Sequence, residues 1–302
     1  MTAHIALVGT TASGKSALAM MLARAHPDIE IVSVDSMQVY RGMDIGTAKP
    51  TASEQAEVRH HLIDLADPDE EFTVARFQRE FVDALEGVEQ RGHRALLVGG
   101  TGLYLRAVVD GLALPGQYPE ARREFEGAAT TQLHTRLAEL DPVAAARMEP
   151  SNRRRIVRAL EVTVGSGRPF SSYGPGLEAY PPTPFRLVGV SLPSVIVTAR
   201  IETRYQRQLD AGFVDEVRRL DARPSGLSRT AAQALGYREL LAHIRGTVTL
   251  DGAIDEAVRR TRQFARRQRA WFRRDPRIEW LAVENDPDEI LPALERLVSG
   301  QT

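Results

Sequence analysis

Near its amino terminus the chain reads Gly9-Thr-Thr-Ala-Ser-Gly14-Lys15-Ser16, directly after the short apolar run 4–8. We call residues 9–16 the G-K-S loop, because they fit the phosphate-binding pattern G-x-x-x-x-G-K-[ST]. The run 4–8 predicts a buried parallel strand, and residues 15–25 predict a helix that ends before Pro27. The two glycines let backbone N–H groups and the helix N-terminus face an anion. The loop therefore predicts phosphate binding, with Lys15 at the terminal phosphate and the Ser16 hydroxyl available to Mg²⁺.

The lysine in this loop is informative because lysine is rare in the chain. Only Lys15 and Lys49 are lysines among 39 basic residues, and all the others are arginine. Lys49 lies in a loop, residues 42–50, that is punctuated by glycine and proline and that we expect to be too polar for the core. A lysine that falls inside a phosphate-binding motif by chance is improbable in such a composition.

Strands and helices alternate over the first hundred residues. After the G-K-S loop and its helix, residues 29–34 predict a second strand, 73–90 a helix and 95–98 a third strand. This order predicts an α/β fold with a doubly wound parallel sheet of the P-loop type, flanked by helices. Asp35 and Gly99 to Thr101 follow the second and third strands. Because the carboxyl ends of parallel strands share one edge, we expect them to meet the G-K-S loop in one crevice.

The pattern changes to helices without strands between residues 115 and 184. We interpret 115–184 as a helical insertion domain, and 1–114 with 185–302 as the catalytic core. Residues 186–191 and 278–283 predict further strands of the core. Residues 195–211, 213–219, 230–244 and 250–273 predict its later helices.

Composition narrows the class of protein. The 302 residues are 43% hydrophobic and 26% charged, as in soluble globular proteins, and no apolar run approaches a membrane span. The first residues do not show the pattern of a signal peptide, so we expect a cytoplasmic protein that does not bind or cross a membrane. The chain has no cysteine, which excludes disulfides, thiolate catalysis and cysteine-based zinc sites. Any bound metal should have oxygen ligands.

Arginine is concentrated in two segments. Residues 259–277 hold nine arginines against one acid, Asp275, and a second cluster comprises Arg153, Arg154, Arg155 and Arg158. Such clusters are either solvated helix faces or surfaces that bind nucleic acid or another polyanion.

Two residues at the predicted crevice have chemistry beyond phosphate binding. Asp35 could hold Mg²⁺ or accept a proton, or it could simply cap a helix, and the Thr101 hydroxyl could face the site or cap a helix. The third strand is not followed by the aspartate that an ATPase would need, which weakens the ATPase interpretation. Whether ATP binds the G-K-S loop stays open.

Seven segments together carry a family resemblance. They are GTTASGKSALA (9–19), VDSMQVYRGMDIGTAKP (34–50), HHLIDLADPDE (60–70), LVGGTGLYLRAVVDGL (97–112), RALEV (158–162), ALGYREL (234–240) and TRQFARRQRAWFRRD (261–275). In this order they closely resemble the bacterial tRNA dimethylallyltransferases, also called tRNA isopentenyltransferases, from about residue 5 to residue 281. Thr10 and Ser16 stand where the family usually has proline and often has threonine, and we expect little effect from either.

The resemblance implies a reaction and its residues. Enzymes of this family transfer the dimethylallyl group of dimethylallyl diphosphate to N6 of the adenosine at position 37 of tRNA, and release diphosphate. The diphosphate would be bound by Gly9, Thr10, Thr11, Ala12, Ser13, Gly14, Lys15, Ser16 and Arg204, with Mg²⁺ as the cofactor at Ser16. Asp35 matches the catalytic carboxylate, Thr101 matches a residue that positions the adenine, and Lys15 and Arg204 complete the catalytic set.

The resemblance also implies contacts with the tRNA anticodon stem-loop. The matching positions are Asp35, Ser36, Met37, Gln38, Thr101, Arg122, Arg154, Arg155, Arg158, Gln233, Gly236, Tyr237, Arg238, Arg267 and Arg274. Trp271 and Phe272 are either part of this surface or part of the core. The oligomeric state is open, and we expect a monomer.

Three other functions remain open at this stage. An isopentenyltransferase that acts on free adenine nucleotide would not need the helical insertion, and a P-loop small-molecule kinase would not need the arginine clusters. A non-enzymatic RNA-binding module would not explain why Lys15, Asp35 and Thr101 converge on one crevice.

Overall fold

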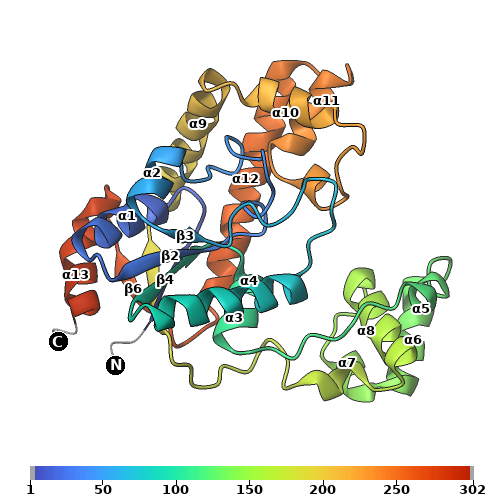
Figure 1. The fold of residues 1–302 in the computed structure, drawn as a ribbon. Coiled ribbons are helices and arrows are strands. Elements are labelled where there is room, and N and C mark those ends of the chain that lie inside the picture. The colour runs from blue at the N-terminus through green and yellow to red at the C-terminus, as the bar shows by residue number, and fades with distance from the viewer. Residues whose placement is uncertain (1–3, 300–302) are drawn as a thin grey trace. The chain divides into compact units, whose positions relative to one another are not determined.

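The computed structural model describes residues 4–299, which form two compact units (Figure 1). The first unit contains the described residues up to Val109 and those from Pro182 onward, and the second is Asp110–Pro181. The sequence placed these boundaries at 114/115 and 184/185.

The first unit is built on one parallel sheet of six strands in the order β3-β2-β4-β1-β5-β6. Its central strands are buried along their length and consist mostly of aliphatic residues, as expected when helices cover both faces. The strands are β1 (Ile5–Gly9), β2 (Ile29–Val34), β3 (His60–His61), β4 (Arg94–Gly99), β5 (Arg186–Ser191) and β6 (Glu279–Ala282). The sheet is therefore the predicted parallel sheet, with one additional short edge strand, β3.

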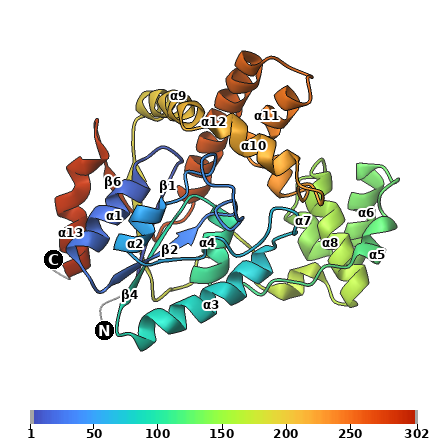
Figure 2. The same ribbon diagram turned by 45° about the horizontal axis from the view of Figure 1, so that its top comes forward.

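Helices cover both faces of this sheet. Figures 1 and 2 show α1 and α13 on one side, and α3, α4 and α12 on the other. The helices of this unit are α1 (Lys15–Ala25), α2 (Ala52–Glu57), α3 (Val74–Gln90), α4 (Gly102–Val109), α9 (Ser194–Asp210), α10 (Phe213–Asp221), α11 (Tyr237–Ile244), α12 (Leu250–Phe272) and α13 (Leu291–Ser299). Within residues 4–299, none of the helices is long and apolar enough to cross a membrane.

The register of the sheet brings three strand ends level. Val8 of β1 and Val34 of β2 both pair with Gly99 of β4, which lies between them. The segments that follow these strands therefore leave the sheet at the same height. The G-K-S loop, Asp35 and Gly100 begin at neighbouring positions along this edge.

One predicted helix is interrupted. Residues 230–244 form a short 3-10 turn, Ala231–Gln233, followed by the separate helix α11. The break falls at Gly236, whose φ of +85° lies in the left-handed region that helical residues do not adopt. A Cβ at this position would lie 2.8 Å from the Phe213 ring, so only glycine fits here.

The second unit is helical and has its own core. Its helices are α5 (Pro119–Arg123), α6 (Thr130–Leu140), α7 (Pro142–Ala146) and α8 (Arg153–Ser166), followed by a 3-10 turn at Phe170–Tyr173. Leu133 and Leu137 of α6 pack against Ile156 and Leu160 of α8. The described residues of this unit contain no strand, as the sequence pattern indicated.

A buried carboxylate ties the first unit together on the amino-terminal side of β2. Glu30 accepts hydrogen bonds from Arg91, His61 and His93 at 2.6–2.8 Å. Burial alone would raise the pKa of Glu30, but these three donors together lower it to about 2. A carboxylate whose folded-state pKa lies below its ordinary value stabilises the protein above that ordinary value and loses the contribution as the pH falls.

Replacing Glu30 by glutamine should therefore destabilise the protein in a pH-dependent way. We expect Glu30→Gln to lower the free energy of unfolding at pH 7 by about 1–3 kcal/mol, because buried donors lose a charged acceptor. The loss should shrink as the pH falls from about 4.5 toward about 2, where the wild-type carboxylate is itself protonated. Urea unfolding across this range measures the effect, with the exposed Glu86→Gln as the control. An equal loss at every pH would contradict the assignment.

Candidate active site

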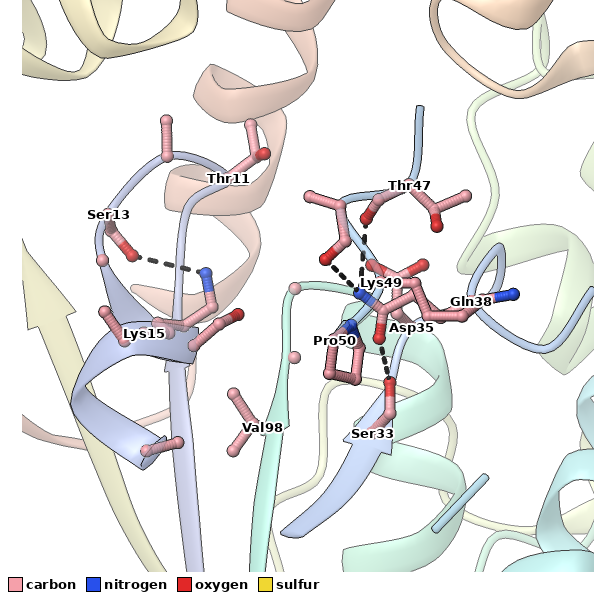
Figure 3. A pocket seen from close by; sticks show the side chains of 18 of the residues that line it. Thr11, Ser13, Lys15, Ser33, Asp35, Gln38, Thr47, Lys49, Pro50 and Val98 are labelled. Carbon is pink, nitrogen blue, oxygen red and sulfur yellow. Dashed lines mark hydrogen bonds between the residues drawn. The ribbon is translucent and has the colours of Figure 1, made fainter. Parts of the chain in front are cut away.

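A cavity of about 370 Å³ opens at the carboxyl edge of the sheet. Figure 3 shows Thr11, Ser13 and Lys15 on one side, Asp35, Gln38 and Thr47 on the other, and Val98 of β4 between them. The cavity is also lined by Gly99, Gly100, Arg200, Arg204, Phe264 and Gln268. The two walls correspond to β1 and β2, which are separated by β4, so the sheet order sets the width of the site.

The G-K-S loop forms the first wall and passes directly into α1. Gly14 precedes the helix with a φ of +85°, and a Cβ there would lie 2.4 Å from Pro287 Cγ, so glycine is required. Lys15 Nζ donates to the Thr10 carbonyl at 2.6 Å and to Ser13 Oγ at 3.3 Å. Burial lowers the pKa of Lys15 to about 8, with Asp35 opposing this shift and Arg204 adding to it. An anion beside Lys15 would favour its charged form.

Two arginines of α9 reach the same loop. Arg204 Nη1 donates to Thr11 Oγ1 at 2.8 Å, and Arg200 Nε donates to the Ala12 carbonyl at 3.1 Å. Arg204 Nε is buried and has no hydrogen-bond partner among the described residues, and burial lowers the pKa of Arg204. The sequence identified Arg204 but missed Arg200, although the spacing of four places both on one face of a helix.

Asp35 stands on the opposite wall, immediately after β2. Its Oδ1 accepts the Met37 N–H at 2.8 Å. Burial raises the pKa of Asp35, although backbone N–H groups of Met37 and Gln38 and the positive charges of Lys15 and Arg204 pull it down. A carboxylate with a raised pKa accepts a proton more readily than an ordinary aspartate, so this position suits a general base.

Thr101 contacts Ser36, the residue that follows Asp35 in the chain. Its Oγ1 accepts the Ser36 N–H at 3.3 Å and lies 3.5 Å from Ser36 Oγ. Ser36 follows Asp35 directly, and Gly100, which lines the cavity, precedes Thr101. The structure therefore brings the segments that follow β2 and β4 into contact, as their strand-end positions predicted.

The loop that follows Gln38 completes the second wall. Gln38 Nε2 donates to the Thr47 and Ala48 carbonyls, while its Oε1 accepts a hydrogen bond from Ser33 Oγ at 2.7 Å. Lys49, at the end of this loop, has a side chain only 2% exposed. The expectation that this loop is too polar for the core is thus wrong at Lys49.

Lys49 is buried because its charge is fully compensated. Its Nζ donates to the Tyr40 carbonyl, to Asp44 Oδ1 and to Asp64 Oδ1 at 2.5–2.7 Å. Two carboxylates and one carbonyl account for the three donors of an ammonium group. Lys49 therefore lines the cavity with all three donors of its ammonium group occupied by protein acceptors.

A second buried carboxylate fixes the same loop from α10. Glu216 accepts the backbone N–H groups of Asp44, Ile45 and Gly46 and, at 2.6 Å, the hydroxyl of Tyr237. A Cβ at Gly46 would lie 2.3 Å from the Phe213 ring, which explains the glycine. Tyr237 is fully buried, and Gly236 beside it is buried as well. The expected contact of Tyr237 with tRNA is corrected, because its side chain is not exposed, whereas the expected contact of Gly236 stays a prediction.

The other residues expected to contact tRNA fall into two groups. Arg122 and Arg158 of the second unit pair with the buried Glu161, and Arg158 also donates to the Pro115 and Gly116 carbonyls. Exposed side chains are presented by Arg154, Arg155, Gln233, Arg238, Arg267 and Arg274. Met37 is half-buried, and Phe272 belongs to the core, with Trp271 packed against it.

The residues present fit a Mg²⁺ ion only if phosphate supplies further ligands. In the part of the chain that the structure describes, no group of three or more histidine, aspartate or glutamate residues could hold a metal. Ser16 is exposed and lines the cavity beside Lys15. Its hydroxyl fits one position around a Mg²⁺ ion that is otherwise bound by phosphate oxygens and water.

The comparisons with known proteins agree with this geometry. The family model described as IPP transferase matches residues 38–275. This chain belongs to that family. The tRNA dimethylallyltransferase of Kineococcus radiotolerans is 49% identical over 95% of this chain and 92% of its own length, and that of Geobacter metallireducens is 45% identical over 96% of both. The resemblance seen in the motifs is thereby confirmed.

Solved structures agree as well. The tRNA isopentenylpyrophosphate transferase of Bacillus halodurans has a TM-score of 0.72 and 36% identity, with 100% of this chain and 97% of that chain covered. A eukaryotic dimethylallyltransferase acting on tRNA has a TM-score of 0.80 at 24% identity, with 99% of this chain and 80% of that chain covered, and supports the fold alone.

The internal position of Tyr237 can be tested directly. We expect Tyr237→Phe to lower the free energy of unfolding by about 1–3 kcal/mol, because the buried Glu216 carboxylate loses a hydrogen-bond donor. RNA affinity should stay at the wild-type level, since the ring is buried. Urea unfolding and RNA titration measure the two effects, with the exposed neighbour Arg238→Ala as the control for stability. Weaker RNA binding at unchanged stability would show that Tyr237 contacts the ligand.

Proposed function

We propose that this protein transfers the dimethylallyl group of dimethylallyl diphosphate to N6 of adenosine 37 in tRNA, and releases diphosphate. The observation that carries the proposal is the pair of facing walls in one cavity. One wall offers Lys15 and Arg204 around a phosphate-binding loop, and the other offers Asp35 with a raised pKa. The names of the relatives supply the substrates: tRNA as the acceptor and a dimethylallyl donor.

The first wall would bind the leaving group. The G-K-S loop and the start of α1 would hold the diphosphate through backbone N–H groups. Lys15 and Arg204 would stabilise the negative charge that grows on the bridging oxygen as the C–O bond breaks. The unpaired Arg204 Nε is a buried donor that a diphosphate oxygen could satisfy. A bound Mg²⁺ ion, held by the Ser16 hydroxyl, would neutralise part of the diphosphate charge.

The second wall would prepare the acceptor. The N6 amine attacks the allylic carbon, so a C–N bond forms while the C–O bond to diphosphate breaks. Asp35 would accept a hydrogen bond from the amine and then take its proton. An exocyclic amine is a weak nucleophile, and its orientation by Asp35, Thr101 and Ser36 would matter as much as basicity.

RNA binding would involve both units. An adenine stacked in an anticodon loop must be flipped out to enter a cavity of this kind. We propose that the first unit has a doubly wound sheet of the P-loop type. We also propose that Asp110–Pro181 is an insertion domain that docks on the anticodon stem. Arg154 and Arg155 would contact the phosphates of that stem. Ser36, Met37, Gln38, Gln233, Arg238, Arg267 and Arg274 would contribute contacts from the first unit, in a monomeric cytoplasmic enzyme.

A transfer assay tests the proposal. The purified protein with Mg²⁺ and radiolabelled dimethylallyl diphosphate receives either an anticodon stem-loop RNA or AMP as the acceptor. We expect label in the RNA alone. Label in AMP would identify an isopentenyltransferase of free nucleotides, and label in neither, together with ATP turnover, would identify a small-molecule kinase.

Asp35 provides the sharpest catalytic prediction. Asp35→Asn keeps the size of the side chain but cannot accept the proton, so we expect transfer to fall by at least about 100-fold. Affinity for the stem-loop should stay close to that of the wild type, because the asparagine oxygen still accepts the Met37 N–H. The radiolabel assay and RNA titration measure these outcomes. Transfer at the wild-type rate would exclude Asp35 as the base.

The exposed arginines of α8 provide a second prediction. Arg154→Ala with Arg155→Ala should weaken stem-loop binding and reduce the slope of log affinity against log salt, because phosphate contacts release counterions. The matched control is Arg136→Ala on α6, whose guanidinium is paired with Glu139. A salt slope identical to that of the wild type would show that Arg154 and Arg155 do not touch phosphate.

A further inference from the structure

One buried side chain joins the first wall of the cavity to the loop that follows β4. Gln268 of α12 is only 6% exposed and lies between the loops that follow β1 and β4. Its Oε1 accepts the Thr11 N–H at 2.7 Å, and its Nε2 donates to the Gly100 carbonyl at 2.9 Å. Thr11 N–H can only donate and the Gly100 carbonyl can only accept, so the partners fix the orientation of the amide.

The contact is close on the Gly100 side. A Cβ at Gly100 would lie 2.2 Å from Gln268 Nε2, so this glycine lets the amide reach the backbone. Two residues further on, a Cβ at Gly102 would lie 2.2 Å from Trp271 Nε1 on the same helix. The G-G-T-G segment is therefore shaped by its contact with α12, in addition to any role as a ligand loop.

Each of the two hydrogen-bond partners of Gln268 is linked to a residue of the proposed reaction. On one side, Thr11 is also held by Arg204, which donates to its hydroxyl. On the other side, Gly100 precedes Thr101, whose hydroxyl accepts the Ser36 N–H next to Asp35. Hydrogen bonds and chain connections thus lead from the first wall through Gln268, Gly100 and Thr101 to Ser36, the neighbour of Asp35 in the second wall.

We propose that Gln268 is a positioning residue that fixes the spacing between the leaving-group wall and the acceptor wall. This inference rests on the proposed function, in which the amine must approach the allylic carbon while diphosphate departs. Displacement of reacting groups by about 1 Å can cost about 100-fold in rate. The Gln268 amide donates to the loop after β4 and accepts from the loop after β1, so one rigid group sets the distance between the two loops. Two separate solvent-exposed side chains would not fix this distance.

Glutamine suits this task because it carries one donor and one acceptor in a plane. An ionised glutamate could still accept from Thr11 but would face the Gly100 carbonyl without a proton to share. A protonated glutamate would restore both hydrogen bonds. Arg266 and Arg267, the residues just before Gln268, are exposed, so α12 combines a basic outer face with this single inward amide.

The test compares Gln268→Ala with Gln263→Ala, an exposed glutamine of the same helix. We expect Gln268→Ala to lower kcat for transfer by about 100-fold, because the loops are no longer held together. Binding of inorganic diphosphate with Mg²⁺, measured by calorimetry, should keep its wild-type stoichiometry and affinity, which shows that the folded fraction is unchanged. Gln263→Ala should match the wild type in both measurements.

Gln268→Glu supplies a readout that a loss of packing would not give. Its kcat relative to that of the wild type should rise as the pH is lowered, because the carboxyl group gains the proton that it donates to Gly100. Gln268→Ala should show no such recovery. Thermal melts at each pH confirm that every variant is folded at the assay temperature.

The outcomes separate this inference from the function on which it rests. If the wild type transfers no label, the proposed function fails and the inference fails with it. With an active wild type, unchanged kcat in Gln268→Ala overturns the inference alone. So does a parallel loss of diphosphate binding and kcat, or a Gln268→Glu variant whose relative kcat does not depend on pH.

Discussion

The parallel pairing of β4 with both β1 and β2 is the constraint on which the site depends. Val8 and Val34 meet Gly99 from opposite sides, so the three strands end at one level. A parallel sheet can place loops from distant parts of the chain side by side only at such an edge. The G-K-S loop, Asp35 and Gly100 each follow one of these strands. The sheet therefore sets where these segments begin, and contacts between the loops, such as those of Gln268, add to the control of their spacing.

Burial then changes the chemistry of the groups that meet there. Lys15 and Asp35 line the same cavity, and removal from water lowers the pKa of the first and raises the pKa of the second. Each shift favours the neutral form, and each group partly opposes the shift of the other. A diphosphate would restore the charge on Lys15, whereas an amine that becomes acidic during transfer would give its proton to Asp35. The same low-dielectric setting thus suits opposite roles on the two walls.

Buried charge elsewhere in the first unit has a different use. Glu30, Lys49 and Glu216 are enclosed by several hydrogen-bond partners each, so no donor or acceptor is left for a ligand. Glu30 joins the amino-terminal side of the sheet, while Lys49 and Glu216 hold the loop that carries Thr47. Arg204 differs from these three, because its Nε is buried without a partner among the described residues. Among the charged groups at the cavity, Arg204 therefore keeps a donor that a ligand could use.

Local patterns predicted the elements that have a strong period or a specific motif. The five strand runs, the helix after the G-K-S loop and the long helix α12 lie where the apolar spacing placed them. The two-residue strand β3 was missed because His60 and His61 are too few and too polar to give a strand signal. The break at Gly236 was missed because the residue type does not show that its φ is positive. Tyr237 was misjudged because its partner Glu216 is on another helix.

Strand patterns alone were enough to assign Lys15, Asp35 and Gly99 to one cavity, because each stands at or next to the end of a recognisable strand. Thr101 contacts Ser36 and is not one of the described residues that line the cavity. The sequence also determined the family, because the motifs and their order can be read without knowledge of the fold. The fold was needed to show that Arg154 is exposed and that Arg158 is paired with the buried Glu161. Only the fold revealed Gln268 as the link between two loops, and Lys49 as a buried structural cation. These roles depend on partners distant along the chain, and the burial and pairing of a side chain are set by the atoms that fold around it.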